Sequence, residues 1–201
     1  MAIQVETVAV DGGAMNCYLV ENTATRELIV VDPGMRADEI IAAINGRKPV
    51  AVLLTHAHYD HIGAVDAICR QYGSPLYMHE GDAAKLTDPE ANVGAYFGRR
   101  VTAETKPTFV AEGQTLTLAH MRLQVLHTPG HSKGCCCYLL PENAGLLCGD
   151  TLFDHGYGRT DFADGDFAEL TQSLRRLMRL HPRMIAYPGH GGATHVGRNE
   201  A

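Results

Sequence analysis

The sequence lacks the features that mark several large protein classes. It contains no apolar stretch long enough to span a membrane, so an integral membrane protein is not expected. No run of basic residues occurs and the formal net charge is −6 at pH 7, which argues against nucleic acid as a partner. The N-terminus has neither the basic nor the apolar region of a signal peptide. We therefore expect a cytoplasmic protein with no membrane or nucleic-acid partner.

Paired cysteine motifs are also missing, although the chain has six cysteines. Cys135, Cys136 and Cys137 are adjacent, and the other three are scattered at positions 17, 69 and 148. This spacing matches neither a secreted disulfide framework nor a Cys-x-x-Cys metal site. Neighbouring side chains of a strand point to opposite faces, so the triplet cannot converge on one metal without a bend. We expect reduced thiols that act as small buried hydrophobic groups.

Internal repeats and low-complexity linkers are absent as well, and 201 residues suit a single domain spanning 1–201. Apolar runs predict strands at residues 3–10, 16–21, 27–31, 50–54, 76–78, 115–118, 122–127, 135–140, 145–148 and 184–186. Helices are predicted at residues 37–44, 61–72, 81–86 and 167–180, the last with a capping box of Asp166 and Glu169. Residues 88–106 have no clear period and are predicted to form a mobile loop or lid. Two strand-rich halves with interspersed helices predict an α/β fold, an αββα sandwich of two mixed sheets flanked by helices.

The segment from Thr55 to His61 carries the strongest chemical signal. It reads Thr-His-Ala-His-Tyr-Asp-His and lies between a predicted buried strand and the start of a predicted helix. His56 and His58 are two residues apart, so on an extended segment they face the same way. Asp60 and His61 fall where the chain reverses into the helix and can point at an adjacent position. Three histidines and one carboxylate are ligands suited to zinc, so this segment predicts a metal site.

Three more residues of this kind follow predicted strand ends later in the chain. His131 lies in Thr-Pro-Gly-His, Asp150 in Gly-Asp, and His190 in Tyr-Pro-Gly-His-Gly. Each is preceded by glycine, which permits close backbone approach. Together with the earlier cluster they make seven possible ligands. Seven are too many for one tetrahedral zinc and about right for two ions that share a bridging ligand.

These four ordered motifs resemble those of the metallo-β-lactamase superfamily, and within it the single-domain glyoxalase II-like (hydroxyacylglutathione hydrolase-like) branch. The resemblance covers nearly the whole chain and implies the metallo-β-lactamase fold with two Zn²⁺, with Fe or Mn as alternative metals. It implies one metal on His56, His58 and His131. It implies a second metal on Asp60, His61 and His190, with Asp150 as the bridge. In β-lactamases proper the position of Asp150 is commonly cysteine or serine, so this aspartate points to the thioesterase-like branches.

Substrate contacts are implied by the segment that follows Asp150. Glyoxalase II has a Gly-Lys there that helps to bind glutathione, and this chain has Gly158-Arg159. The planar guanidinium of Arg159 suits a carboxylate, so it is our candidate substrate anchor, with a structural ion-pair arginine as the alternative. His155 lies between Asp150 and Arg159 and is a second candidate. Asp32 is expected to support the site as a hydrogen-bond acceptor rather than to bind metal.

Glyoxalase II also has a C-terminal helical domain that completes its glutathione pocket, whereas eleven residues follow His190 here. We therefore expect any thiol-binding surface to come from loops, or from a partner subunit if the protein is a homo-oligomer.

The resemblance implies a metal-dependent hydrolase in which a zinc-bound hydroxide, oriented by Asp60, attacks the carbonyl of a small anionic thioester or ester. The expected substrates are S-lactoylglutathione-like thioesters, because a thiolate leaves without an acid catalyst. Three alternatives stay open. An iron-dependent persulfide dioxygenase would use His56, His131 and Asp150 as a 2-His-1-carboxylate site. A lactonase or another hydrolase of this fold would use the two-metal centre, and a non-enzymatic scaffold would keep only the fold.

Overall fold

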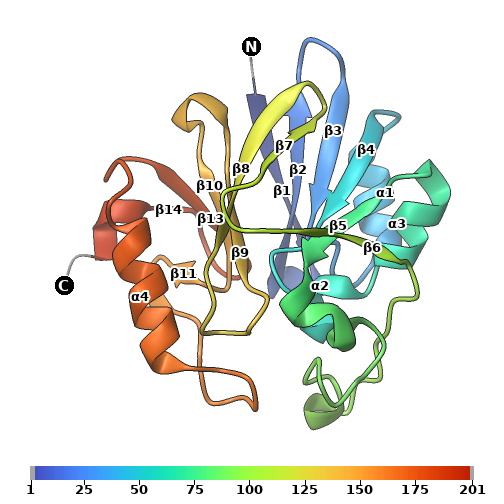
Figure 1. The fold of residues 1–201 in the computed structure, drawn as a ribbon. Coiled ribbons are helices and arrows are strands. Elements are labelled where there is room, and N and C mark those ends of the chain that lie inside the picture. Colours follow the sequence, from blue (N-terminus) through green and yellow to red (C-terminus); the bar gives the residue numbers. More distant parts are fainter. Residues whose placement is uncertain (1–2, 200–201) are drawn as a thin grey trace.

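Two six-stranded sheets stacked face to face form the centre of the molecule, which the computed structural model describes from residue 3 to residue 199 (Figure 1). Helices α1 (Ala37–Ile44) and α3 (Val65–Tyr72) cover the outer face of one sheet. Helix α4 (Phe167–Leu177) covers the outer face of the other. The order of layers is helix, sheet, sheet, helix, which confirms the predicted αββα sandwich.

The first sheet has its strands in chain order and changes from antiparallel to parallel at its middle. Strands β1, β2 and β3 pair antiparallel, and β3, β4, β5 and β6 pair parallel. Their bounds are Ile3–Val10, Met15–Asn22, Glu27–Val31, Lys48–Leu53, Leu76–His79 and Pro107–Val110. Helix α1 joins β3 to β4, α3 lies between β4 and β5, and the segment that contains the short helices η2 (Glu80–Leu86) and η3 (Ala95–Phe97) joins β5 to β6, since parallel strands require a crossover.

The second sheet has the order β14-β13-β10-β9-β8-β7, and only its β10–β13 pair is parallel. In chain order from β7 to β10 the bounds are Thr115–Leu118, Met121–His127, Cys136–Leu139 and Leu146–Gly149. Strands β13 and β14 span Ile185–Pro188 and Thr194–His195, and a small separate hairpin joins β11 (Leu152–Phe153) to β12 (Gly156–Tyr157).

Three apolar layers hold these elements together. The layer between the two sheets includes Val20, Ile29 and Leu123. Because successive side chains alternate across a strand, Leu19 and Val30 point the other way and pack with α1 and α3. A third layer lies between the second sheet and α4. All six cysteines are buried and free, as predicted.

The structure corrects one predicted helix, because residues 61–72 are not continuous. The chain instead forms α2 (Tyr59–Ile62), breaks, and resumes as α3. At the break Ala64 has φ −105° and ψ 3°, and its N–H donates to the Pro33 carbonyl at 2.9 Å. A Cβ on Gly63 would lie 2.5 Å from Met35 Sδ. The turn that follows β3 packs into this gap and ends α2.

Smaller differences concern short elements. Helix α4 ends at Leu177 rather than at residue 180, but its capping box is present, since Asp166 Oδ1 accepts from the Glu169 N–H at 2.9 Å. Strands β11, β12 and β14 were not predicted, because two residues are too few to show a period, and β6 was not predicted either. Residues 88–106 contain only the short helix η3 (Ala95–Phe97), and their mobility stays a prediction. No helix in residues 3–199 is long and apolar enough to cross a membrane.

Candidate metal centre

All seven predicted ligands come together beside strand ends of both sheets. His56 and His58 follow β4, and Asp60 and His61 lie on α2. His131 follows β8, Asp150 follows β10, and His190 follows β13. Their possible ligand atoms lie within 4.8 Å of one another in three groups: His56, His58 and His131; Asp60, His61 and His190; and His56, His61 and Asp150. The first two groups have the same members as the two ligand sets that the family resemblance implies.

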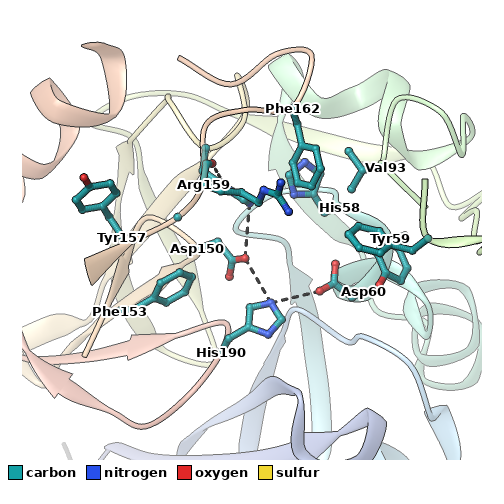
Figure 2. A pocket seen from close by; sticks show the side chains of 13 residues that line it. His58, Tyr59, Asp60, Val93, Asp150, Phe153, Tyr157, Arg159, Phe162 and His190 are labelled. Atoms are coloured by element: carbon teal, nitrogen blue, oxygen red, sulfur yellow. Dashed lines mark hydrogen bonds and ion pairs between the residues drawn. The ribbon is translucent and has the colours of Figure 1, made fainter. Parts of the chain in front are cut away.

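Asp150 lies between these two sets. Its Oδ2 is 3.6 Å from His131 Nε2 and 3.4 Å from His190 Nε2, and its Oδ1 is 3.5 Å from His61 Nε2. The same His190 nitrogen is 3.3 Å from Asp60 Oδ2, so His190 stands between two carboxylates (Figure 2). A carboxylate within reach of histidines from both sets is the arrangement that a bridging ligand requires.

The far side of three imidazole rings is held by hydrogen bonds that aim Nε2 at the centre. His131 Nδ1 donates to the Arg159 carbonyl at 2.7 Å, and His190 Nδ1 donates to the Ala14 carbonyl. His61 Nδ1 donates to Asp32 Oδ2 at 3.1 Å. Hydrogen bonds of this kind fix the tautomer and the ring orientation of metal-binding histidines.

Asp32 supports the site as the sequence predicts. Its buried carboxylate accepts from the Thr55 N–H at 2.7 Å and from the Thr55 hydroxyl at 2.6 Å, in addition to His61. Because the Thr55 hydroxyl uses its one hydrogen to donate to Asp32, its oxygen accepts a hydrogen bond from His56 Nδ1 at 3.2 Å. One carboxylate thus orients a histidine from each ligand set.

A second buried carboxylate, Asp82 on the short helix η2 (Glu80–Leu86), was not predicted. Its Oδ2 accepts from the Ala57 N–H at 2.9 Å and from the Ser132 hydroxyl at 2.8 Å, and its Oδ1 accepts from the Gly134 N–H at 2.8 Å. Ala57 lies between two predicted ligands and Ser132 follows a third, so Asp82 ties two ligand loops together. These partners are 25 to 52 residues away in sequence, so no local pattern indicates this role.

Buried polar atoms that lack a hydrogen-bond partner indicate that the residues fit a metal. Among the side chains of residues 3–197, those atoms include His61 Nε2, His131 Nε2 and Asp150 Oδ1, which all face the centre. His56 Nε2 and His58 Nδ1 also face each other at 3.1 Å. Each unpaired buried group costs about 1–3 kcal/mol, a cost that ligation removes. Imidazole nitrogens with carboxylate oxygens are donors that suit zinc or iron.

The protonation of the centre differs between its two halves. Burial, together with neighbouring histidines, lowers the pKa of His56 well below its ordinary value and that of His58 to about 3. Burial alone would lower the pKa of His61 too, but the carboxylates around it, Asp150 first, raise it to about 9. Hydrogen bonds to Asp150 and Asp60 likewise outweigh burial and raise the pKa of His190 to about 11. Cations that bind the second half therefore displace protons.

The centre opens into a cavity of about 400 Å³ (Figure 2). Arg159, the predicted substrate anchor, lines this cavity, but its Nε and Nη2 are 2.6 and 2.7 Å from the two carboxylate oxygens of Asp161. Its guanidinium carbon also lies 4.3 Å from the ring centre of Phe162. His155, the other predicted substrate contact, does not line the cavity, and its side chain is 82% exposed beside Asp154.

Comparison with known proteins identifies the family of the chain. The family model of the metallo-beta-lactamase superfamily matches residues 10–190. The chain is 34% identical to the probable metallo-hydrolase YqgX of Bacillus subtilis, with 85% of this chain and 82% of the relative covered. It is 30% identical to the hydroxyacylglutathione hydrolase GloC of Haemophilus influenzae, with 98% and 95% covered.

Solved structures agree over the same length. The BLEG-1 B3 metallo-beta-lactamase superposes with a TM-score of 0.91 at 34% identity and covers 97% of this chain and 95% of its own. The protein TTHA1623, solved in a di-iron-bound form, superposes with a TM-score of 0.80 at 34% identity and covers 92% and 91%. The region matched by the family model includes all seven candidate ligands, from His56 to His190.

Proposed function

The chain belongs to the metallo-beta-lactamase superfamily and is a metal-dependent hydrolase with a candidate His/Asp metal site, and we propose that it hydrolyses thioesters of the S-lactoylglutathione type. The similarity to GloC, a hydroxyacylglutathione hydrolase, supports this reaction. The observation that carries the proposal is the composition of the cavity wall, because the wall determines which leaving groups can be protonated as they depart.

The cavity offers no obvious acid to protonate a leaving group. Apart from the metal-ligand candidates, the described cavity-lining residues that carry an exchangeable side-chain proton are Tyr59, Tyr157 and Arg159. Burial, aided by Asp60, raises the pKa of Tyr59, which makes it a still weaker acid. An efficient general acid has a pKa near the working pH, and tyrosine and arginine titrate near 10 and above 12. A thiolate, whose conjugate acid has a pKa of about 8.5, leaves without such help, whereas an alkoxide or an amine does not.

The protein's own groups have separable roles in this reaction. Two divalent cations, held by the two ligand sets with Asp150 between them, would supply hydroxide at neutral pH and polarise the substrate carbonyl. Asp60 lines the cavity beside His190, where its carboxylate can accept a hydrogen bond from the attacking water and orient it. Asp32 holds His61 in place throughout. Arg159 offers the donors that Asp161 leaves available to an anionic part of the substrate.

We assign zinc as the metal, and the di-iron form of TTHA1623 makes iron the alternative to measure. The test is metal analysis of protein purified without added metal, followed by hydrolysis of S-lactoylglutathione. We expect two zinc ions per chain and hydrolysis that falls more than about 100-fold in Asp150→Ala, together with loss of metal.

Three outcomes would overturn parts of this proposal. One iron per chain, with oxygen uptake on glutathione persulfide, would identify a dioxygenase. Cleavage of a chromogenic cephalosporin without thioester cleavage would place the activity with that of BLEG-1, which is called a metallo-beta-lactamase. Full metal content in Asp150→Ala would remove Asp150 from the ligand set.

A further inference from the structure

We infer that the acyl group of the substrate is aromatic or comparably bulky and apolar, and that it lies against an aromatic wall made of Tyr59, Phe97 and Phe162. This inference rests on the proposed thioesterase function, which it extends from a reaction to a class of acyl group. Figure 2 shows Tyr59 and Phe162, with Val93 between them, on one side of the cavity and Phe153 and Tyr157 on the other.

The wall is built from three separate segments that meet beside the metal centre. Tyr59 belongs to α2, Phe97 to η3, and Phe162 to the loop before α4. The Tyr59 and Phe97 ring centres are 5.6 Å apart, and those of Phe97 and Phe162 are 6.4 Å apart and nearly perpendicular, at 82°. Phe162 also meets the ring of His58 edge to face at 5.6 Å. The wall therefore begins directly beside a predicted metal ligand.

Part of this wall is exposed to solvent. Phe97 is 47% exposed, and the neighbouring Tyr96, which contacts both Phe97 and Phe162, is 75% exposed. Large exposed apolar groups that gather at a cavity mark a binding surface more often than isolated ones do. A ring of the substrate placed against this wall would bury apolar area and gain edge-to-face contacts.

Charge decides which part of the substrate lies there. Of the described residues lining the cavity, Arg159 is the one Lys or Arg, and Asp161 already occupies the edge of its guanidinium formed by Nε and Nη2. Arg159 can pair with one carboxylate of a thiol carrier such as glutathione, but the cavity wall has no partner for the carrier's other charges, and their desolvation against the aromatic rings would be costly. The carrier therefore stays towards solvent. The group that enters is the one bonded to the reacting carbonyl, close to Asp60 and His58.

The experiment compares S-mandeloylglutathione with S-lactoylglutathione, which differ by a phenyl group in place of a methyl group. We expect kcat/KM to be at least about tenfold higher for the mandeloyl thioester. Phe97→Ala should reduce this preference by about three- to tenfold, and Phe97→Leu should restore part of it. The matched control is Phe109→Ala, because Phe109 is an equally exposed ring, at 48%, that does not line the cavity. It should leave the preference unchanged.

A binding measurement separates this inference from the proposed function. The dissociation constants of the product acids, mandelate and lactate, are measured by calorimetry on the metal-replete protein, and mandelate should bind at least about tenfold more tightly. Hydrolysis of both thioesters at equal kcat/KM would refute the aromatic acyl group and leave the thioesterase standing. Tighter mandelate binding that Phe97→Ala weakens, without hydrolysis of any thioester, would refute the thioesterase and leave the wall standing. Equal binding of the two acids would overturn the inference whatever the reaction.

Discussion

Replacing Asp82 by alanine should weaken both the fold and the metal centre. Asp82 is 1% exposed, and besides its bonds to Ala57, Ser132 and Gly134 it accepts from Lys85 Nζ at 3.0 Å. The side chain of Lys85 is only 6% exposed, and its other partner is Asp164. In the variant, two buried N–H groups and one hydroxyl would lose their acceptor, and the Lys85 ammonium would lose one of its two carboxylate partners.

The expected cost follows from these losses. Removing one partner of a buried ion pair costs about 3–5 kcal/mol, because the remaining charge stays buried. Each unpaired buried donor costs about 1–3 kcal/mol on its own, but losses at one site overlap and do not add. We therefore expect Asp82→Ala to lower the free energy of unfolding by about 3–5 kcal/mol. Because Asp82 ties together the loops that carry His58 and His131, metal affinity should fall as well, by roughly 10–100-fold.

Urea unfolding at fixed pH measures the first effect, and competition with a chelator measures the second. Lys48→Ala is the control, since Lys48 pairs with Glu27 at 2.8 Å but is 73% exposed, and an exposed pair contributes at most about 1 kcal/mol. The double variant Asp82→Asn with Lys85→Met should recover part of the loss, because it removes a buried ammonium that has lost one of its two carboxylate partners. If Asp82→Ala costs no more than Lys48→Ala and retains its metal affinity, the supporting role of Asp82 is refuted.

Three further predictions concern Asp32, Gly130 and the pH dependence of the Asp82 contribution. Asp32→Asn should weaken metal binding by roughly 10–100-fold by chelator competition, because His61 loses its charged acceptor, and unchanged affinity would count against this. Gly130→Ala should cost more than about 1 kcal/mol in urea unfolding, since its φ is +132° and a Cβ would lie 2.2 Å from a backbone nitrogen of α4, whereas Gly12→Ala, with φ +72° and open space, should cost less. Burial tends to raise the pKa of Asp82, but the Lys85 ammonium lowers it by more, so the pKa in the folded protein lies below the ordinary value. The stability that the Asp82 carboxylate contributes is therefore full above the unfolded pKa of about 3.9 and is lost as the pH falls through the lower folded pKa. The stability difference between the protein and Asp82→Ala should therefore shrink as the pH of the urea titration is lowered below about 4, and a difference that grows there would contradict the assignment.

The side chains that gather at the candidate metal centre could be identified from the sequence because their signals are local. Each candidate ligand follows an apolar run that forms a strand, and a short polar segment after a buried strand has few other structural uses. Helix α1 was predicted with its observed bounds for a similar reason, since both of its ends are marked by nearby residues. Local patterns of this kind require no knowledge of what lies across the fold.

The features that were missed depend on contacts between distant segments. The break between α2 and α3 arises because Gly63 meets Met35 from the turn after β3, which no periodicity of residues 61–72 can reveal. The role of Asp82 requires Ala57 and Gly134 to be adjacent to it, which only the sheet order brings about. Periodicity reports which face of an element is apolar, and it does not report which element covers that face.

The candidate metal ligands and the residues of the cavity wall come from different kinds of segment, and this difference bears on which substrate binds. The candidate metal ligands lie at strand ends and on α2, braced by the buried carboxylates of Asp32 and Asp82. Much of the cavity wall comes instead from η3 and from the irregular segment before α4, which carry Phe97 and Phe162. Loop residues can change without disturbing a site that is fixed by strands, so one centre can serve many substrates. Family membership therefore supports a metal-dependent hydrolase, and we expect the aromatic wall to determine which substrate it accepts.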